Sequence, residues 1–137
     1  KTIQSIRKYS DRQIIVRFHP GDKNRIQHIR SLVRYRLKAV APSNSDSLLI
    51  DLKNAHAVVS YNSSPGVVSA IEGVPVFVLD PDRSQASDVA NKSLQNIESP
   101  KEFDREMWIR KMAQMHWTLD ELKDGSAWRH VRQWAKK

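Results

Sequence analysis

The sequence predicts an α/β protein with a parallel β-sheet, because short apolar runs alternate with helical patterns along the first part of the chain. The runs are Gln13–Phe18, Ala57–Ser60 and Pro75–Leu79, and each has the length and β-branched or aromatic content of a strand. Parallel strands end at the same edge of a sheet, where ligands bind in α/β proteins. We therefore expect the loops after these three strands to lie along one edge.

Composition and length limit the alternatives. The chain has 137 residues, 39% hydrophobic and 28% charged, which is typical of one soluble domain. The absence of cysteine excludes a disulfide framework, a thiolate metal site and a cysteine nucleophile. No apolar run approaches the roughly 20 residues that cross a bilayer. Because the chain starts at Lys1 without an initiator Met or a cleavable signal sequence, we expect a cytoplasmic fragment of a longer protein.

Three segments are expected along the chain. Residues 1–12 are polar and aperiodic, which indicates a linker or the remnant of a connection to a missing N-terminal domain. Residues 13–100 contain the alternating strands and helices of the α/β domain. Residues 101–137 are expected to form helices that pack on that same domain.

The positive charge is unevenly distributed. Residues 1–40 contain eleven Lys/Arg and two Asp/Glu, whereas residues 41–137 contain twelve and thirteen, which together give the net charge of +8. A basic segment can attract nucleic acid, an anionic membrane surface or a phosphate-bearing small molecule. Several of its cations recur at helical spacing, namely Arg25, Arg30, Arg34 and Lys38. We therefore favour a solvated helix face for most of these charges.

Two helices are expected in the first half of the chain. The turn His19–Asp22 closes the first strand, and a helix should follow over Lys23–Val40. Its apolar spacing of three and four predicts a buried stripe formed by Ile26, Ile29, Leu32, Val33 and Leu37. Ala41–Ser47 has the composition of a loop. A short helix is then expected to reach Asn54, with Ser45 or Asp46 as its N-cap.

The next helix is expected over Pro65–Glu72. Pro65 suits its first turn, where a missing N–H costs nothing, so Ser64 is the natural N-cap and Gly73 ends the helix. Further helices are expected over Glu102–His116, starting at Ser99 or Pro100, then after a capping box, and again after a turn. The capping box is Thr118 with Glu121, and the turn is Asp124-Gly125-Ser126. The four tryptophans, at positions 108, 117, 128 and 134, are expected in core or interdomain packing, because nucleic-acid stacking would place them among basic residues.

The turn Asn62–Gly66 is the most informative local feature. A helix N-terminus presents free N–H groups and the positive end of the helix dipole, so hydroxyls on Ser63 and Ser64 would suit a phosphate there. Taken alone, the turn is better explained by Ser64 as a simple cap with Ser63 in solvent, because capping serines are common.

His19 and Glu72 are further candidates. His19 ends the first strand before Pro20 and could donate a hydrogen bond to a phosphate or a base and assist a leaving phosphate, although a lone strand-end histidine is more often an ordinary polar residue. Glu72 could accept hydrogen bonds from ribose hydroxyls or simply be an exposed helix-end carboxylate. The expected topology brings these candidates to one side of the sheet. Arg17 cannot be assigned to this side from strand alternation.

Other chemistry lacks motifs in this sequence. There is no Walker loop, no GxGxxG and no GxSxG elbow, which argues against an ATPase, a dinucleotide enzyme and an α/β serine hydrolase. The five histidines, at positions 19, 28, 56, 116 and 130, lack metal-ligand spacing. We therefore expect neither a metal nor a cofactor.

The order of these motifs resembles the C-terminal, nucleotide-sugar-binding domain of GT-B fold glycosyltransferases. It is most similar to the bacterial capsule polysaccharide biosynthesis family, including Kdo transferases, and more distantly to bacterial sialyltransferases with an HP motif and a Ser-Ser motif. The resemblance rests on the strand before His19-Pro20, on Tyr61–Val67 and on Ala70–Phe77. The run Gln114–Gly125 also resembles that family, and the whole resemblance covers about residues 13–128.

The resemblance implies a Rossmann-like parallel sheet that is one half of a GT-B fold, with a helical C-terminal tail. It implies that His19 and Pro20 contact a CMP-sugar donor, that Ser63 and Ser64 bind its phosphate, and that Glu72 lies near its ribose. Asn62 and Gly66 belong to the same Ser-Ser turn. The expected partners are a CMP- or UDP-sugar, a glycan or other acceptor, and a missing N-terminal domain.

In such families the catalytic carboxylate comes from the N-terminal domain, so we assign no catalytic base and expect the isolated chain to be inactive. Two other functions remain as alternatives. A nucleotide-sugar 2-epimerase of the same fold is disfavoured, because those enzymes usually show a Gly-Gly turn where this chain has Ser63-Ser64-Pro65-Gly66. A nucleic-acid-binding module would use residues 1–40, and a sugar transferase acting on DNA would combine both functions.

Overall fold

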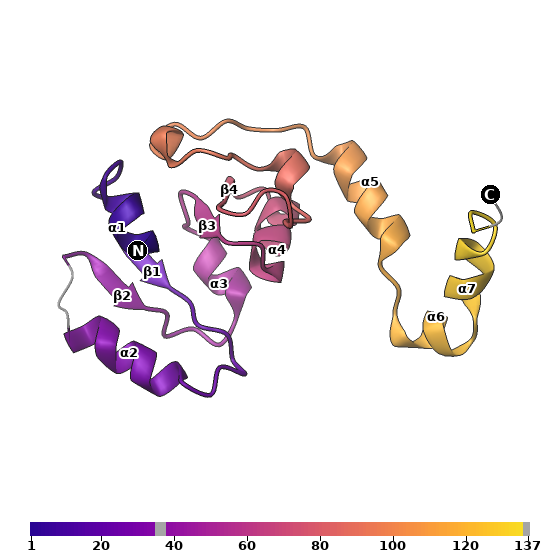
Figure 1. Ribbon diagram of the computed structural model, residues 1–137, viewed down its shortest axis with the longest axis horizontal. Helices are drawn as coiled ribbons and strands as arrows, with labels where there is room; N and C mark the ends of the chain where they lie inside the picture. Colours follow the sequence, from indigo (N-terminus) through magenta and orange to yellow (C-terminus); the bar gives the residue numbers. More distant parts are fainter. Residues whose placement is uncertain (35–37, 136–137) are drawn as a thin grey trace. The chain divides into compact units, whose positions relative to one another are not determined.

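A computed structural model describes residues 1–34 and 38–135, and the chain divides into two compact units, Lys1–Phe103 and Asp104–Lys137 (Figure 1). The strands of the first unit are β1 (Ile14–Val16), β2 (Val40–Pro42), β3 (Val58–Ser60) and β4 (Val76–Val78). Its helices are α1 (Thr2–Arg7), α2 (Arg25–Arg34), α3 (Leu48–Leu52) and α4 (Ser64–Glu72), with the 3-10 helices η1 (Ser87–Val89) and η2 (Leu94–Asn96). The helices of the second unit are α5 (Glu106–Met115), α6 (Leu119–Lys123) and α7 (Ser126–Val131).

The first unit has mixed α/β structure with two small parallel sheets. β1 pairs with β2, with Ile14 opposite Val40, and β3 pairs with β4, with Val58 opposite Val76. The three predicted strands and their parallel character are therefore confirmed. The single sheet containing all three strands is not found, because no strand ladder joins β1 to β3 in the described part of the chain.

The partner of β1 is β2, a strand that no sequence pattern predicted. β2 lies where the end of a long helix and the start of a loop were expected. α2 stops earlier, and the chain turns at Ala39, which has a positive φ of 55°. Arg7 supports this turn from α1, since its guanidinium donates to the carbonyls of Lys38 and Ala39 over 3.1 and 2.8 Å. The turn thereby aligns β2 with β1, and the Ile14 N–H donates to the Ala39 carbonyl.

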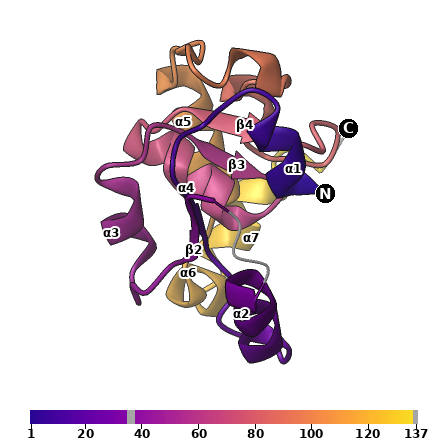
Figure 2. The ribbon, with the colours of Figure 1, turned by 90° about the vertical axis from the view of Figure 1, so that its left-hand side faces the viewer.

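A small hydrophobic core connects the two sheets. Ile6, Phe77 and Ile97 form a buried cluster, and the partly buried side chains packed against it are Ile14, Ala57, Val59 and Leu94. Ile14 belongs to β1 and Val59 to β3, so both sheets contribute to one core. β4 is the most buried strand, and α4 packs against β3 and β4 (Figure 2).

Residues 1–12 are more than the aperiodic linker that the sequence suggested. They contain α1, whose Ile6 is only 8% exposed and belongs to the core cluster. Arg7 also donates to the carbonyls of Ser10 and Arg12, which fixes the chain between α1 and β1. The sequence did not predict this helix, because Ile6 is its one buried residue and no apolar stripe runs along it. A connection to a preceding domain stays a prediction.

The apolar stripe of α2 is less buried than its periodicity predicts. Ile29 and Leu32 are half-buried, whereas Ile26 and Val33 are 67% and 60% exposed. Leu37, the fifth residue of the expected stripe, lies outside the described residues. α2 packs against β2 of a two-stranded sheet, which is too narrow to cover the whole stripe.

The second unit contains the predicted capping box. Thr118 Oγ1 accepts from the Glu121 N–H, and the Glu121 carboxylate accepts from the Thr118 N–H. α5 begins later than expected, because the Asn91 side chain occupies both the N–H and the carbonyl of Lys101. Trp108 is buried, but Trp128 and Trp134 are exposed, so core packing is wrong for those two, and interdomain packing stays a prediction. None of the helices in the described residues has the length and apolar character to span a bilayer.

Candidate functional site

Polar side chains gather where β3 ends and α4 begins. Ser63 is the N-cap residue of α4, one position before the predicted Ser64, but its side chain makes no capping bond. Its hydroxyl lies 3.0 Å from that of Ser60 instead. Ser64 is exposed, and among the described residues neither its hydroxyl nor its N–H has a hydrogen-bond partner. The first turn of α4 therefore has two donors, the N–H and the hydroxyl of Ser64, that no capping side chain engages.

Gly66 allows this arrangement. It is buried, and a Cβ at this position would lie 3.1 Å from the Cβ and 3.2 Å from the Oγ of Ser60. The absence of a side chain lets the first turn of α4 approach the end of β3 closely. The structure thus gives Gly66 a packing role in the turn.

The ends of β3 and β4 are joined beyond the strands themselves. The Leu79 N–H donates to the Ser60 carbonyl, and Asn62 Nδ2 donates to Asp80 Oδ2 over 3.0 Å. We call the resulting cluster the α4 rim. It comprises Ser60, Asn62, Ser63, Ser64 and Asp80. Of the residues predicted from the sequence, Asn62, Ser63, Ser64 and Gly66 are therefore brought together, and Asp80 is an addition.

His19 and Pro20 follow the other sheet, at the carboxyl end of β1. His19 is exposed, and its Nδ1 lies 3.0 Å from the Gly21 backbone nitrogen, whose N–H it accepts. A neutral ring that accepts at Nδ1 carries its proton on Nε2, which is then a free donor. No hydrogen bond or ion pair in the described part of the chain joins this turn to the α4 rim.

Glu72 does not lie on the same edge as these residues. It ends α4, whereas Ser64 begins it, so the two are about 12 Å apart along the helix axis at a rise of about 1.5 Å per residue. A helix that connects parallel strands runs back from the carboxyl edge, which places its last residue near the amino edge. The expectation that all candidates share one edge is thus wrong for Glu72.

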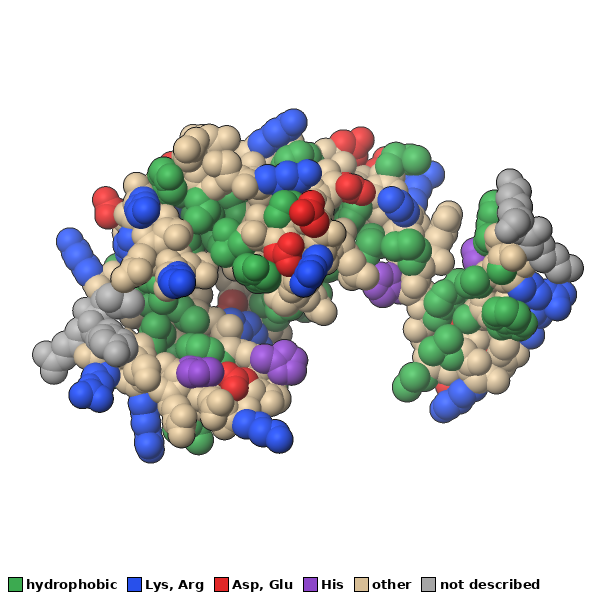
Figure 3. Space-filling model, viewed as in Figure 1, with side chains coloured by type: hydrophobic (Ala, Val, Ile, Leu, Met, Phe, Trp, Pro, Cys, Tyr) green, Lys and Arg blue, Asp and Glu red, His purple; other side chains and the backbone are tan. Residues whose placement is uncertain are grey.

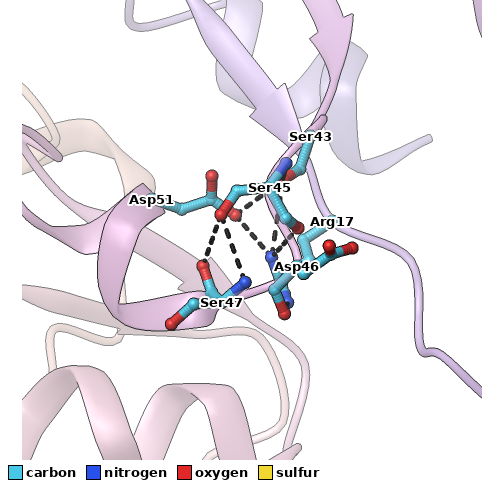
Figure 4. Close-up of polar contacts among 6 residues, drawn as sticks. All are labelled: Arg17, Ser43, Ser45, Asp46, Ser47 and Asp51. Atoms are coloured by element: carbon cyan, nitrogen blue, oxygen red, sulfur yellow. Dashed lines mark hydrogen bonds and ion pairs between the residues drawn. The ribbon is translucent and has the colours of Figure 1, made fainter.

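Arg17, which strand alternation could not assign to a site, lies at the centre of a polar network (Figure 4). Its guanidinium forms an ion pair of 2.7 Å with Asp51 Oδ2, where the two side chains are 24% and 19% exposed. The same guanidinium donates to the carbonyls of Ser45 and Asp46, and Ser43 Oγ donates to Asp51 over 2.7 Å. The network fastens the loop after β2 to α3. Strand periodicity could not reveal it, because β2 itself was not predicted.

A small hollow lies beside this network at the carboxyl ends of β1 and β2. Its volume is about 110 Å³, and it is lined by residues that include Phe18, Pro20, Arg25, Ile29, Ser43 and Ser45. Arg25, at the start of α2, has no acidic partner within the described ranges, unlike Arg17. Pro20 is the predicted site residue that this hollow includes.

Asp22 fixes the loop between β1 and α2. The hydrogen bond that the Asn24 N–H donates to it lowers the pKa of Asp22, and so does its contact with His28 Nδ1 at 2.8 Å. Phe18 stacks on the His28 ring, with their centroids 5.8 Å apart. Because the pKa of Asp22 is lowered in the folded chain, its ionised carboxylate stabilises the fold at pH values above the ordinary carboxyl pKa. This stabilisation is lost as the pH falls through the lowered pKa.

The arrangement offers hydrogen-bond donors and acceptors rather than ligands for a metal. Across residues 1–34 and 38–135, no group of three His, Asp or Glu side chains is placed to hold a metal ion. Comparisons of the chain with protein-family models, with curated proteins and with solved structures give no match. The interpretation of the site therefore depends on its own chemistry.

Replacing Arg17 by methionine is expected to lower the free energy of unfolding by about 2 kcal/mol, because it leaves Asp51 without its cation and two loop carbonyls without a donor. Urea denaturation measures this loss. The matched control is Arg34→Met, at an exposed position of α2, with an expected change within about 0.5 kcal/mol. Equal effects of the two variants would contradict a structural role for the Arg17 network.

Proposed function

We propose that the chain is the nucleotide-sugar-binding half of a glycosyltransferase that acts in capsule or other surface polysaccharide synthesis. The proposal combines the motif resemblance with the α/β architecture and with the polar groups at the carboxyl ends of its parallel strands. It assigns to this chain the binding of the donor, and to a separate domain the acceptor and the catalytic base. The nucleotide is that of a CMP- or UDP-sugar.

One observation carries the proposal. At the start of α4, the N-cap residue Ser63 makes no capping bond, although N-cap serines usually do, and the hydroxyl and the N–H of Ser64 have no partner in the described structure. Free donors at the positive end of a helix dipole form a binding site for a phosphate. During transfer, the same donors would stabilise the negative charge that develops on the departing phosphate.

The neighbouring residues have complementary roles in this proposal. Asp80 offers a carboxylate acceptor for a sugar hydroxyl, and its bond to Asn62 Nδ2 holds it in place. His19 offers Nε2 as a donor to the phosphate or the base. The hollow of about 110 Å³ beside Pro20 is smaller than the roughly 300–1,000 Å³ of typical small-molecule sites, so it would hold only part of a sugar nucleotide. The proposed separate domain would then enclose the rest of the sugar nucleotide.

Calorimetric titration of the chain with CMP, UDP and GDP tests the proposal. One nucleotide should bind selectively, and Ser64→Ala should weaken it by about tenfold or more, because a hydrogen bond to a charged group contributes about 1.5–3 kcal/mol. Ser99→Ala is the matched control, since Ser99 is exposed and lies outside the α4 rim. Binding to a short DNA duplex alone, with steep salt dependence, would instead assign function to the basic residues 1–40.

A further inference from the structure

The second unit has an exposed apolar surface next to a group of cations, and we propose that this surface binds the face of an anionic lipid membrane. Its exposed apolar residues are Leu119, Leu122, Trp128, Val131 and Trp134, which we call the C-terminal face. Leu119 and Trp134 are 72% and 70% exposed, and Trp128 is 64% exposed. Figure 3 shows hydrophobic side chains gathered over the α6–α7 part, with Lys and Arg side chains beside them. This proposal does not depend on nucleotide binding.

The apolar residues after Gly125 share one side of the helical segment. Trp128 and Val131 are three residues apart within α7, and Trp134 follows three residues later. Beyond α7 the chain continues as tight turns, because the Trp134 N–H donates to the Val131 carbonyl. Side chains three residues apart nearly eclipse one another in such turns. The two tryptophans therefore lie on the same side, with Val131 between them.

The charge of this segment favours an anionic partner. Residues 126–137 contain four cations and no Asp or Glu, the cations being Arg129, Arg132, Lys136 and Lys137. Arg129 donates only to neutral acceptors, the carbonyl of Asp124 and the hydroxyl of Ser126, over 3.0 and 2.8 Å. Within the described residues Arg129 forms no direct ion pair, although its charge helps to lower the pKa of the nearby Asp124. The positive charge of this segment is complementary to lipid phosphates.

The acidic residues nearby are engaged in local contacts. Glu121 accepts hydrogen bonds from Thr118 in the capping box, and Asp124 accepts the Ser126 N–H. Asp120 lies 4.0 Å from Lys123, which balances its charge. Hydrogen bonds lower the pKa of both Glu121 and Asp124, which favours their ionised forms. Their negative charges therefore lie on α6 and on the turn that follows it. Even with all three counted, residues 117–137 keep a net positive charge.

A membrane fits this surface better than a second copy of the chain. Tryptophan is enriched where hydrocarbon meets lipid headgroups, and amphipathic helices with Lys or Arg on their polar side lie in that plane. Two copies meeting through this face would bring like charges together. An anionic bilayer instead receives the tryptophans and attracts the cations, each of which raises membrane affinity several-fold.

The test is sedimentation of the full chain with vesicles of phosphatidylcholine, with and without about 30% phosphatidylglycerol, at about 0.15 M salt. We expect binding only to the anionic vesicles. Arg129→Gln with Arg132→Gln should weaken it by about 30-fold, from two lost cations. Trp128→Ala with Trp134→Ala should weaken it at least tenfold. The matched control is Arg25→Gln with Arg30→Gln, which removes the same charge from α2 and should preserve binding.

Three results would overturn the proposal. The first is no binding to anionic vesicles. The second is binding that the α2 variant abolishes and the α7 variants preserve, which would assign it to residues 1–40. The third is that the wild-type chain dimerises or binds DNA, and that variants of the C-terminal face lose this association but bind vesicles as the wild type does. Circular dichroism of each variant confirms that the loss does not come from unfolding.

Discussion

Phe77→Ala is expected to lower the free energy of unfolding by about 3–5 kcal/mol, because it removes the largest side chain of the shared core. Phe77 is the central residue of β4 and is only 1% exposed. It forms the buried cluster with Ile6 and Ile97. Small domains are stable by about 5–15 kcal/mol, so this single change removes a large fraction of the total. Thermal or urea denaturation of the chain measures the loss.

The same variant tests whether the two sheets share one core. Ile14 of β1 and Val59 of β3 both pack against the Phe77 cluster, so we expect the first unit to unfold in one cooperative transition. Tyr61→Ala is the matched control, an aromatic truncation at a position that is 62% exposed, with an expected change within about 0.5 kcal/mol. A loss below about 1 kcal/mol for Phe77→Ala would contradict the proposed core.

Asn91→Leu is expected to cost about 2–4 kcal/mol, because leucine has a similar size but cannot replace the amide. Asn91 is 7% exposed, and its side chain both donates to the Lys101 carbonyl and accepts from the Lys101 N–H, over 3.1 and 3.0 Å. Its backbone continues the sheet beside Phe77. The residue therefore joins the edge of β4 to the segment that leads out of the first unit.

Denaturation of Asn91→Leu, compared with Asn96→Leu at an exposed position, measures this contribution. Asn91→Asp separates the two hydrogen bonds, since a carboxylate still accepts from the Lys101 N–H but cannot donate to its carbonyl. We expect this variant to be destabilised as well. Wild-type stability in both Asn91 variants would show that the side-chain bridge to Lys101 contributes little.

The strands that could be predicted from the sequence are those with continuous apolar runs. β4 is a fully buried short strand and β3 a partly buried one, with Ser64-Pro65-Gly66 at the start of the helix between them, and these local signals are strong. β2 could not be predicted, because Val40–Pro42 is too short for a pattern and contains a proline. Its position depends on long-range contacts, above all those of Arg7 with the turn before it.

The candidate site was predictable only in part, for the same reason. The turn before α4 was recognised because its serines, proline and glycine are consecutive. The Arg17 network joins residues that are up to 34 positions apart, and no periodicity reports such contacts. Glu72 was placed on the wrong edge because it ends α4, whereas the serine turn begins this helix. Nine residues of helix separate the two ends, although both ends connect to strands of the same sheet.

The central claim is that a nucleotide binds at the carboxyl ends of both sheets. An NMR titration of the isotope-labelled chain with CMP, UDP and GDP tests it most directly, because every backbone N–H reports its own surroundings. We expect one nucleotide to shift the N–H signals of Ser63 and Ser64 together with those of His19 and Gly21, with Ser64→Ala reducing both sets. Shifts confined to α2 that are equal for all nucleotides and for DNA would contradict the claim.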